Sequence, residues 1–308
     1  QYSLACGDIC WRYKNLTLVK VSHSQAWLLV VDRFTQGIEK EQGVGLARKI
    51  GTDLSAYLIS IKKLKHPWIC SSDADASLPN NYFTSLSERD KKTVVCCFNF
   101  HHGCNDTKIN QANLLYEKAL RYYVAGLQYA NSPYAFFTIG SILAFKAEAY
   151  VQARGFPKRS AGEDFYLLNK LAKLGQVEFI ENVIVKLEAR TSQRVPFGTG
   201  PAVQKILDLQ ISQQAYCYYH PEIFTLLKST LHAFSNLWPY RENIALWLQN
   251  QPELVRSALV EIGFENFVKK QQKSNEVQFN KQVIVWFDAF KTLKFIHSLR
   301  EQHYQDIP

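Results

Sequence analysis

The chain has 308 residues, 47% of them hydrophobic and 20% charged, which excludes a disordered or fibrous protein and allows one large domain or two ordinary ones. Of the net charge of +9, residues 1–200 carry +8, which suits an anionic ligand such as a nucleotide diphosphate, a polyanionic acceptor or an anionic membrane surface. A solvated basic surface is the alternative. No apolar run approaches the ~20 residues of a membrane span, and Gln1–Cys10 has no basic segment typical of a secretory signal, so we expect a soluble, cytoplasmic protein with at most a peripheral contact to the inner face of a membrane.

The first half of the chain predicts strands that alternate with helices. Ala26–Asp32 is typical of a buried parallel strand that ends in a carboxylate. A helix is expected over 43–64, where apolar residues recur at helical spacing. A second buried strand, Pro67–Ser71, runs directly into Ser72-Asp73-Ala74-Asp75, and a short helix is expected from Pro79 to Leu86.

Two further strands, Thr93–Phe100 and Phe136–Phe145, flank an amphipathic helix over 112–130. This alternation predicts a Rossmann-like α/β fold with a mostly parallel sheet, in which ligands bind beyond the carboxyl ends of the strands. After residue 200 the strand signals end, and helices are expected over 202–219, 221–238, 241–248, 252–270 and 279–300. We therefore predict two units, residues 1–200 and an all-helical C-terminal extension over residues 201–308.

The strongest chemical motif is Asp73-Ala74-Asp75 at the end of a predicted buried strand. Two carboxylates one residue apart, where the chain leaves the sheet, suit a hard divalent cation such as Mn²⁺ or Mg²⁺. Such an ion would bridge the phosphates of a nucleotide sugar and offset charge on the leaving diphosphate. The alternative is a turn in which an aspartate caps the following helix.

A second acidic pair, Glu163-Asp164, follows Gly162 and opens the apolar segment Phe165–Leu171. Acidic residues are favoured at a helix N-terminus by the helix dipole, so simple capping is a serious alternative. The Gly-Phe-Pro turn at 155–157 and the loop that follows it would let these carboxylates project into a cleft. The dipole would tend to lower the pKa of the carboxyl and keep it ionised.

Together these segments resemble a known family. The order LLVVD, GVGLARKIGTDL, ICSSDAD with LPNNY, TIGSILAF, GFP and GEDFYLLNKL is similar to that of the family 2 glycosyltransferases with the GT-A fold, over roughly residues 26–200. The resemblance implies metal-dependent, inverting transfer of a sugar from a nucleotide-diphosphate sugar, with a UDP-sugar favoured. The acceptor, whether glycan, lipid or small molecule, is not indicated, and no nucleic acid is expected as a partner.

The resemblance also implies roles for particular residues. Asp32 matches the carboxylate that helps to hold the nucleotide base or ribose, and Arg48 matches an arginine on the nucleotide side. Asp73 and Asp75 match the Asp-x-Asp pair, with Asp75 the direct metal ligand and Asp73 bound to the metal or the ribose. Asp164 matches the general base.

Asp164 suits general-base catalysis if it stands across the cleft from the metal pair, where it would remove the proton of the attacking acceptor hydroxyl. Glu163 would then orient the acceptor or brace the loop. His101 and His102, expected just after the strand Thr93–Phe100, are candidates for the acceptor side, although a surface-loop role fits them equally well.

The chain also departs from the family pattern. The Pro-x-x-Asn-Glu loop that usually opens the family is not found in Gln1–Lys20, and the Gln-x-x-Arg-Trp motif of processive polymerases is missing. In place of that motif stand Arg190, Arg194, Gly198 and Thr199. Two arginines and a Gly-Thr-Gly turn are suited to closing over the donor diphosphate through guanidinium and backbone N–H groups, and a basic surface loop is an equal alternative.

The cysteines give a weaker signal. Seven cysteines fit reduced thiols better than a disulfide framework. Cys96 and Cys97 lie next to each other in a predicted strand, so their side chains point to opposite faces and cannot easily share one zinc ion. We expect small buried thiols there.

Three other functions remain open at this stage. A retaining GT-A transferase would use the metal pair without needing Asp164 as a base. A sugar nucleotidyltransferase shares the core, but its Gly-rich, basic N-terminal signature is not visible. A non-catalytic GT-A-like binding or scaffold protein is the third, and it has no need of the four carboxylates at Asp73, Asp75, Glu163 and Asp164.

Overall fold

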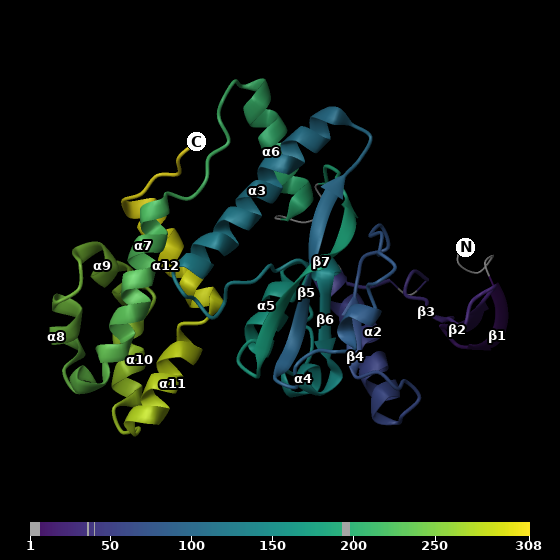
Figure 1. Ribbon diagram of the computed structural model, residues 1–308, viewed down its shortest axis with the longest axis horizontal. Coiled ribbons are helices and arrows are strands. Elements are labelled where there is room, and N and C mark those ends of the chain that lie inside the picture. The colour runs from purple at the N-terminus through teal and green to yellow at the C-terminus, as the bar shows by residue number, and fades with distance from the viewer. Residues whose placement is uncertain (1–6, 36, 40, 193–197) are drawn as a thin grey trace.

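A computed structural model describes residues 7–35, 37–39, 41–192 and 198–308 (Figure 1). The described chain is mixed α/β, with two separate sheets and a C-terminal helical region. The coarse expectation of an α/β protein with a helical extension is confirmed.

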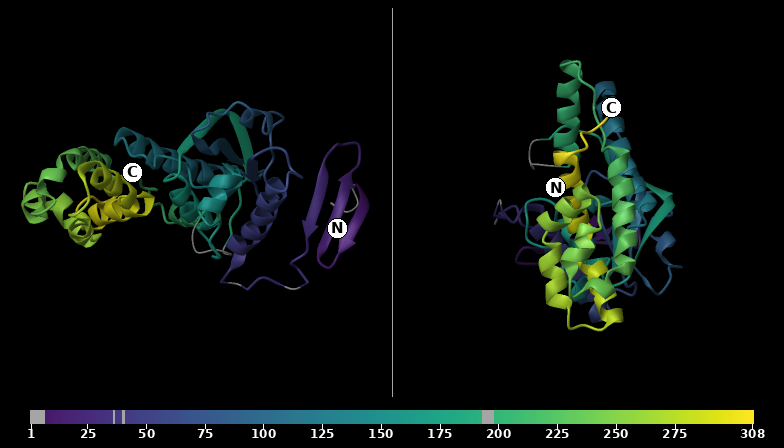
Figure 2. Two further views of the ribbon diagram at one scale, coloured as in Figure 1. Left: turned by 90° about the horizontal axis from the view of Figure 1, so that it is seen from below. Right: turned by 90° about the vertical axis from the view of Figure 1, so that its left-hand side faces the viewer.

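The first sheet is an antiparallel meander of β1 (Gly7–Tyr13), β2 (Leu16–Val21) and β3 (Trp27–Val31). It lies to one side of the rest of the molecule (Figures 1 and 2). The prediction of a buried parallel strand over Ala26–Asp32 is therefore wrong, because β3 is antiparallel to β2 and its residues are exposed or half-buried. A short turn allows β2 to pair with neighbours close in sequence, and this local pairing replaces the long-range pairing of a parallel sheet.

The second sheet has the strand order β4-β6-β5-β7. Its strands and the helices between and around them follow one another along the chain as α2 (Gly43–Ser60), β4 (Trp68–Ser71), η1 (Thr84–Leu86), β5 (Thr93–Gly103), α3 (Thr107–Tyr129), η2 (Gly140–Ile142), β6 (Leu143–Lys146), α4 (Ala147–Gln152), α5 (Glu163–Leu171) and β7 (Gln176–Glu188). Strand β6 is antiparallel to both of its neighbours, and β5 and β7 are parallel. The sheet is thus mixed in orientation, whereas the sequence predicted a mostly parallel one.

Strand β5 is the centre of this sheet and of the first core. Val95, Cys96, Cys97 and Phe98 are all 0% exposed, as expected for a strand covered on both faces. Burial raises the pKa of the Cys96 thiol to about 12, so this thiol stays protonated at neutral pH. The expectation of small buried thiols in this strand is confirmed.

The C-terminal region consists of α6 (Thr199–Ile211), α7 (Pro221–Ala233), η3 (Phe234–Asn236), η4 (Trp238–Tyr240), α8 (Ile244–Gln249), α9 (Glu253–Glu261), α10 (Phe264–Gln271), α11 (Glu276–Trp286) and α12 (Ala289–Gln302). Two of the expected long helices are divided. Gly263, with a φ of 83°, separates α9 from α10, and Asp288 caps α12 through the backbone N–H groups of Phe290 and Lys291. Helices α7–α12 enclose a second hydrophobic core.

The two cores are joined through α3 and through a polar contact between α5 and α12. Val124 of α3 packs in the first core, and Leu127 of the same helix packs in the second. Asn169 of α5 donates to an Asp288 carboxylate oxygen at 2.9 Å and accepts from the N–H of Ala289 at 3.0 Å. Helix α3 therefore contributes to both cores. The boundary expected at residue 200 stays a prediction.

Candidate functional site

The candidate site is organised around Arg48, which lies in the second turn of α2. Its Nε donates to Glu163 Oε1 at 2.9 Å, and its Nη2 donates to Asp73 Oδ1 at 2.5 Å. Its Nη1 donates to Ser71 Oγ at 2.7 Å and to the carbonyl oxygen of Gly140 at 3.2 Å. One guanidinium therefore connects α2, the end of β4, the start of η2 and the start of α5.

Two glycines allow this close packing. A Cβ atom at Gly140 would lie 2.8 Å from Arg48 Nη2, and one at Gly45 would lie 2.4 Å from the carbonyl oxygen of Pro157. The Gly45 N–H donates to the carbonyl oxygen of Arg159 at 2.9 Å. Gly45 thus seats α2 against the loop that leads into α5, which brings Arg48 within reach of Glu163.

The two residues of the Glu163-Asp164 pair differ in their surroundings. Glu163 is 4% exposed and is neutralised by Arg48. Asp164 Oδ1 accepts from the N–H of Phe165 at 2.7 Å. Burial, followed by the charge of Glu163, raises the pKa of Asp164 to about 6. The lowering expected from the helix dipole is therefore wrong in direction, because burial beside a second carboxylate outweighs the backbone donors and Arg48.

The second carboxylate of the Asp-Ala-Asp motif has its own arginine. Arg190 Nη2 lies 2.9 Å from Asp75 Oδ2. The loop that carries Asp75 is held against β7 by paired backbone hydrogen bonds, in which the N–H of Ser77 donates to Lys186 at 2.8 Å and the N–H of Lys186 donates to Ser77 at 3.0 Å. These bonds keep the motif beside the end of β7, from which Arg190 extends.

The start of α6 approaches the same region. Thr199 is its first residue, and Gly198 precedes it with a φ of 110° that favours glycine. The Thr199 side chain lies near the phenol of Tyr116 of α3. Burial, then the charges of Tyr216 and Asp164, raises the pKa of Tyr116 to about 12, so Thr199 and Asp164 are near the same phenol. Arg194 lies outside the described residues.

Asp32 is not brought to this cluster. It follows β3 in the first sheet, and its carboxylate accepts from the N–H of Phe34 at 2.8 Å and from Thr35 Oγ1 at 3.0 Å. The hydrogen bonds from Phe34 and Thr35 lower the pKa of Asp32. The contact of Asp32 with the nucleotide, which the family resemblance implies, stays a prediction.

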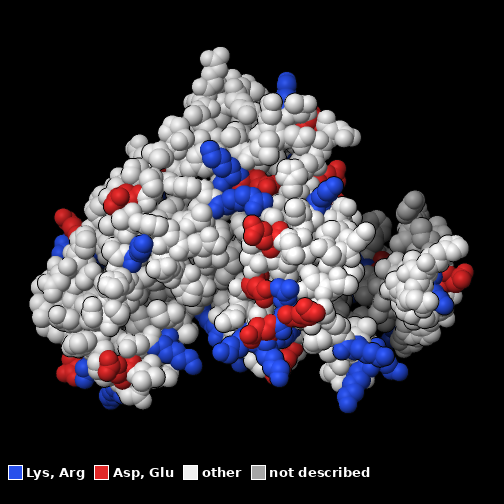
Figure 3. Space-filling model, in the orientation of Figure 1, with Lys and Arg blue, Asp and Glu red and all other residues white. Residues whose placement is uncertain are grey.

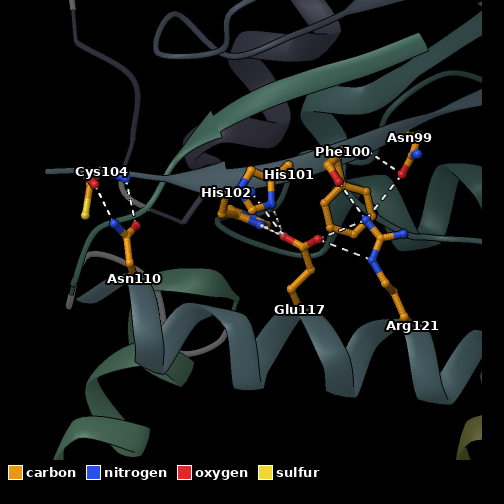
Figure 4. A network of polar contacts seen from close by, with 8 residues as sticks. All are labelled: Asn99, Phe100, His101, His102, Cys104, Asn110, Glu117 and Arg121. Atoms are coloured by element: carbon orange, nitrogen blue, oxygen red, sulfur yellow. Dashed lines mark hydrogen bonds and ion pairs between the residues drawn. The ribbon is translucent and has the colours of Figure 1, made fainter. Parts of the chain in front are cut away.

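The two histidines also differ from expectation, because β5 continues through both of them. The His102 side chain is 2% exposed, and its Nδ1 lies 3.2 Å from Glu117 Oε2 of α3, whereas the His101 side chain is 55% exposed with its Nδ1 at 3.7 Å from the same oxygen. Figure 4 shows both rings directed toward Glu117, with Arg121 on the other side of the carboxylate. The His102 ring is therefore buried against α3, and an acceptor-side role for His101 or His102 stays a prediction.

Glu117 is a residue that sequence analysis missed, although its position in α3 facing a strand with two histidines was a usable signal. Burial alone would raise the pKa of Glu117, but hydrogen bonds from His102 and Arg121 outweigh it and lower the pKa to about 2. Arg121 Nη2 lies 2.9 Å from Glu117 Oε1. The carboxylate therefore links α3 to β5 as a charged group.

Replacing Glu117 with alanine is expected to lower the free energy of unfolding at pH 7 by about 1.5–3 kcal/mol, because the backbone N–H of His102 and the half-exposed guanidinium of Arg121 lose a charged acceptor. The pKa of Glu117 is below its ordinary value of 4.5, so the stabilisation is present above pH 4.5 and is lost as the pH falls through about 2. Urea unfolding at several pH values measures this. Gln111→Ala, at an exposed position of the same helix, is the control. A loss that is equal at pH 2 and pH 7 would assign the effect to packing and not to charge.

The basic character of the first 200 residues is partly displayed away from the site. Figure 3 shows lysine and arginine side chains gathered at the lower edge of the face in view, toward the ends of α2 and α4. The segment after α2 contributes Lys62, Lys63 and Lys65, all exposed. These lysines lie more than three helical turns beyond Arg48, roughly 20 Å along the helix axis. An anionic surface as their partner stays a prediction.

A divalent cation at Asp73 and Asp75 stays a prediction. Within residues 7–35, 37–39, 41–192 and 198–308, no group of three or more His, Cys, Asp or Glu side chains is arranged to hold a metal. Mg²⁺ and Mn²⁺ sites in phosphate-handling enzymes need only one or two carboxylates, because phosphate oxygens and waters supply the remaining ligands. In the structure a guanidinium lies against each of Asp73 and Asp75.

Comparison with known proteins adds no family assignment. No family model matches the chain, and no curated protein matches it. Among the helices of the described part, none is both long and apolar enough to cross a membrane.

Proposed function

We propose that this protein is a metal-dependent glycosyltransferase that moves a sugar from a nucleotide-diphosphate sugar to an acceptor hydroxyl with inversion. The observation that supports it best is the convergence on Arg48. Glu163 and Asp73 come from segments that lie 115 and 25 residues from Arg48 along the chain, and both contact its guanidinium. One residue of each acidic pair thereby contacts the same buried guanidinium.

On this proposal Asp75 is the main protein ligand of Mn²⁺ or Mg²⁺ together with the donor diphosphate, and Asp73, whose Oδ1 is held by Arg48, binds the ion through its other oxygen or binds the ribose. The ion would offset negative charge on the departing nucleotide diphosphate. Arg190, Gly198 and Thr199 belong to the donor side, where a guanidinium fork and helix N-terminal N–H groups suit phosphate oxygens.

Asp164 is the proposed general base. A base operates best when its pKa is near the working pH, and burial beside Glu163 raises the pKa of Asp164 to about 6. An ordinary aspartate, with a pKa of 3.8, would accept a proton from a hydroxyl far less readily. Glu163, held by Arg48, is a bracing residue that also contributes to this shift.

Thermal unfolding in the presence of candidate donors tests the proposal. We expect the melting temperature to rise by roughly 5 °C with a UDP-sugar and Mn²⁺ together, because a ligand at 100 times its Kd adds about 2.7 kcal/mol of stability. GDP- and TDP-sugars with Mn²⁺, UDP-sugar with EDTA, and Mn²⁺ alone are the comparisons. If no nucleotide sugar raises the melting temperature with metal present, the proposal is wrong.

A further inference from the structure

The two arginines at the Asp-Ala-Asp motif are held in different ways. The Arg48 side chain is 11% exposed and is fixed by Glu163, Ser71 and Gly140 in addition to Asp73. The Arg190 side chain is 53% exposed, and it reaches Asp75 from beyond the end of β7. Arg48 is thus part of the framework, whereas the contact between Arg190 and Asp75 is an exposed ion pair.

The backbone keeps the two members of this exposed pair near each other. The hydrogen bonds between Ser77 and Lys186 hold the carboxylate loop to β7 in antiparallel fashion. Asp75 lies two residues before Ser77, and Arg190 lies four residues after Lys186. The Arg190 side chain can therefore turn away from Asp75 while the backbone pairing stays intact.

A divalent cation on Asp75 would compete with this guanidinium. Arg190 Nη2 lies 2.9 Å from Asp75 Oδ2. A cation bound to the same carboxylate would therefore lie close to the guanidinium, and the two positive charges would repel each other. A diphosphate beside the cation would remove the conflict, because it offers oxygens that a guanidinium fork binds well.

We propose that Arg190 is the counter-ion of Asp75 in the donor-free protein and transfers to the donor diphosphate when donor and metal bind. This inference rests on the proposed function. Arg190 then couples the two ligands. Its guanidinium weakens metal binding in the absence of donor and strengthens donor binding in the presence of metal. Coupling of this kind is reciprocal between the two ligands.

Mn²⁺ titration followed by electron paramagnetic resonance of the free ion tests this without any activity measurement. Arg190→Ala is expected to bind Mn²⁺ about 2- to 5-fold more tightly than the unmodified protein when no nucleotide is present, in line with the modest strength of exposed ion pairs. With Mn²⁺ present, the same variant is expected to bind UDP about 10-fold more weakly. Arg12→Ala, at an exposed position of β1, is the matched control and is expected to behave as the unmodified protein.

The possible outcomes separate this inference from the function beneath it. If the unmodified protein binds no Mn²⁺ even with UDP, the proposed function and the inference both fail. If it binds Mn²⁺ with UDP but Arg190→Ala shows no gain in affinity for Mn²⁺ alone, the inference alone fails. A gain in Mn²⁺ affinity without a loss of UDP affinity also overturns it, because the guanidinium then never transfers to the diphosphate.

Discussion

Replacing Asp164 with asparagine is expected to lower kcat by about 10²- to 10⁴-fold while donor binding is retained. Asparagine keeps the shape of the side chain and can still accept from the N–H of Phe165, but it cannot take a proton from the acceptor. Turnover with the donor identified by thermal unfolding, together with the donor Kd, measures the two effects separately. In the unmodified protein kcat/KM should rise with pH through about 6, the pKa of Asp164.

Asp164→Asn is also expected to change how the free energy of unfolding depends on pH. The folded-state pKa of Asp164 is above its ordinary 3.8, so its contribution to stability falls as the pH rises from about 4 to about 6. Asp164→Asn removes this fall, and its stability relative to the unmodified protein should be higher at pH 8 than at pH 4. Near-normal turnover, or a product that retains the anomeric configuration, would rule out Asp164 as the base and favour the retaining alternative.

Replacing Asp75 with alanine is expected to abolish metal-dependent binding of the donor while the fold stays intact. The carboxylate is the proposed main protein ligand of the ion, and it lies in a turn after β4 with a side chain that is 29% exposed. Truncation there leaves no large cavity and breaks only an exposed ion pair. Donor titration with and without Mn²⁺ measures the binding, and far-ultraviolet circular dichroism checks the fold.

The matched control for this variant is Asp8→Ala, an exposed aspartate of β1 in the first sheet. It changes the net charge by the same amount at a position away from Arg48. Unchanged donor affinity of Asp75→Ala in the presence of Mn²⁺ would remove Asp75 from the metal site.

The parts of the site that sequence analysis anticipated are those whose positions follow from strand ends and helix starts. Asp73 directly follows a buried strand, and Glu163 directly opens a helix, so only their meeting at Arg48 required the structure. That meeting depends on the close approach of Gly45 and Gly140 to their neighbours. Spacing along the chain shows that glycines are present, but it does not show which backbone or side chain each one admits.

The misplacements have physical causes of two kinds. Asp32 was assigned to a parallel strand because Trp27–Val31 is short and apolar, and such a run does not reveal whether its partner is near or far in sequence. His102 is expected just after a strand, because the apolar run Thr93–Phe100 ends before it. The strand instead continues, since His102 pairs with Leu187 of β7 and its ring is compensated by Glu117, a partner that only the packing of α3 supplies.

The pairing of β5 with β7 has a consequence for how the chain is made. Thr93 pairs with Gln176, so roughly 80 residues must be synthesised between the two strands, about 4–16 s at ribosomal rates. Throughout that interval β5 lacks its parallel neighbour, so the backbone N–H and C=O groups along that edge are unpaired, and the core that fully buries the thiols of Cys96 and Cys97 in the finished fold is incomplete. The nascent chain is then more open to oxidation and to aggregation through β5 than the native protein ever is.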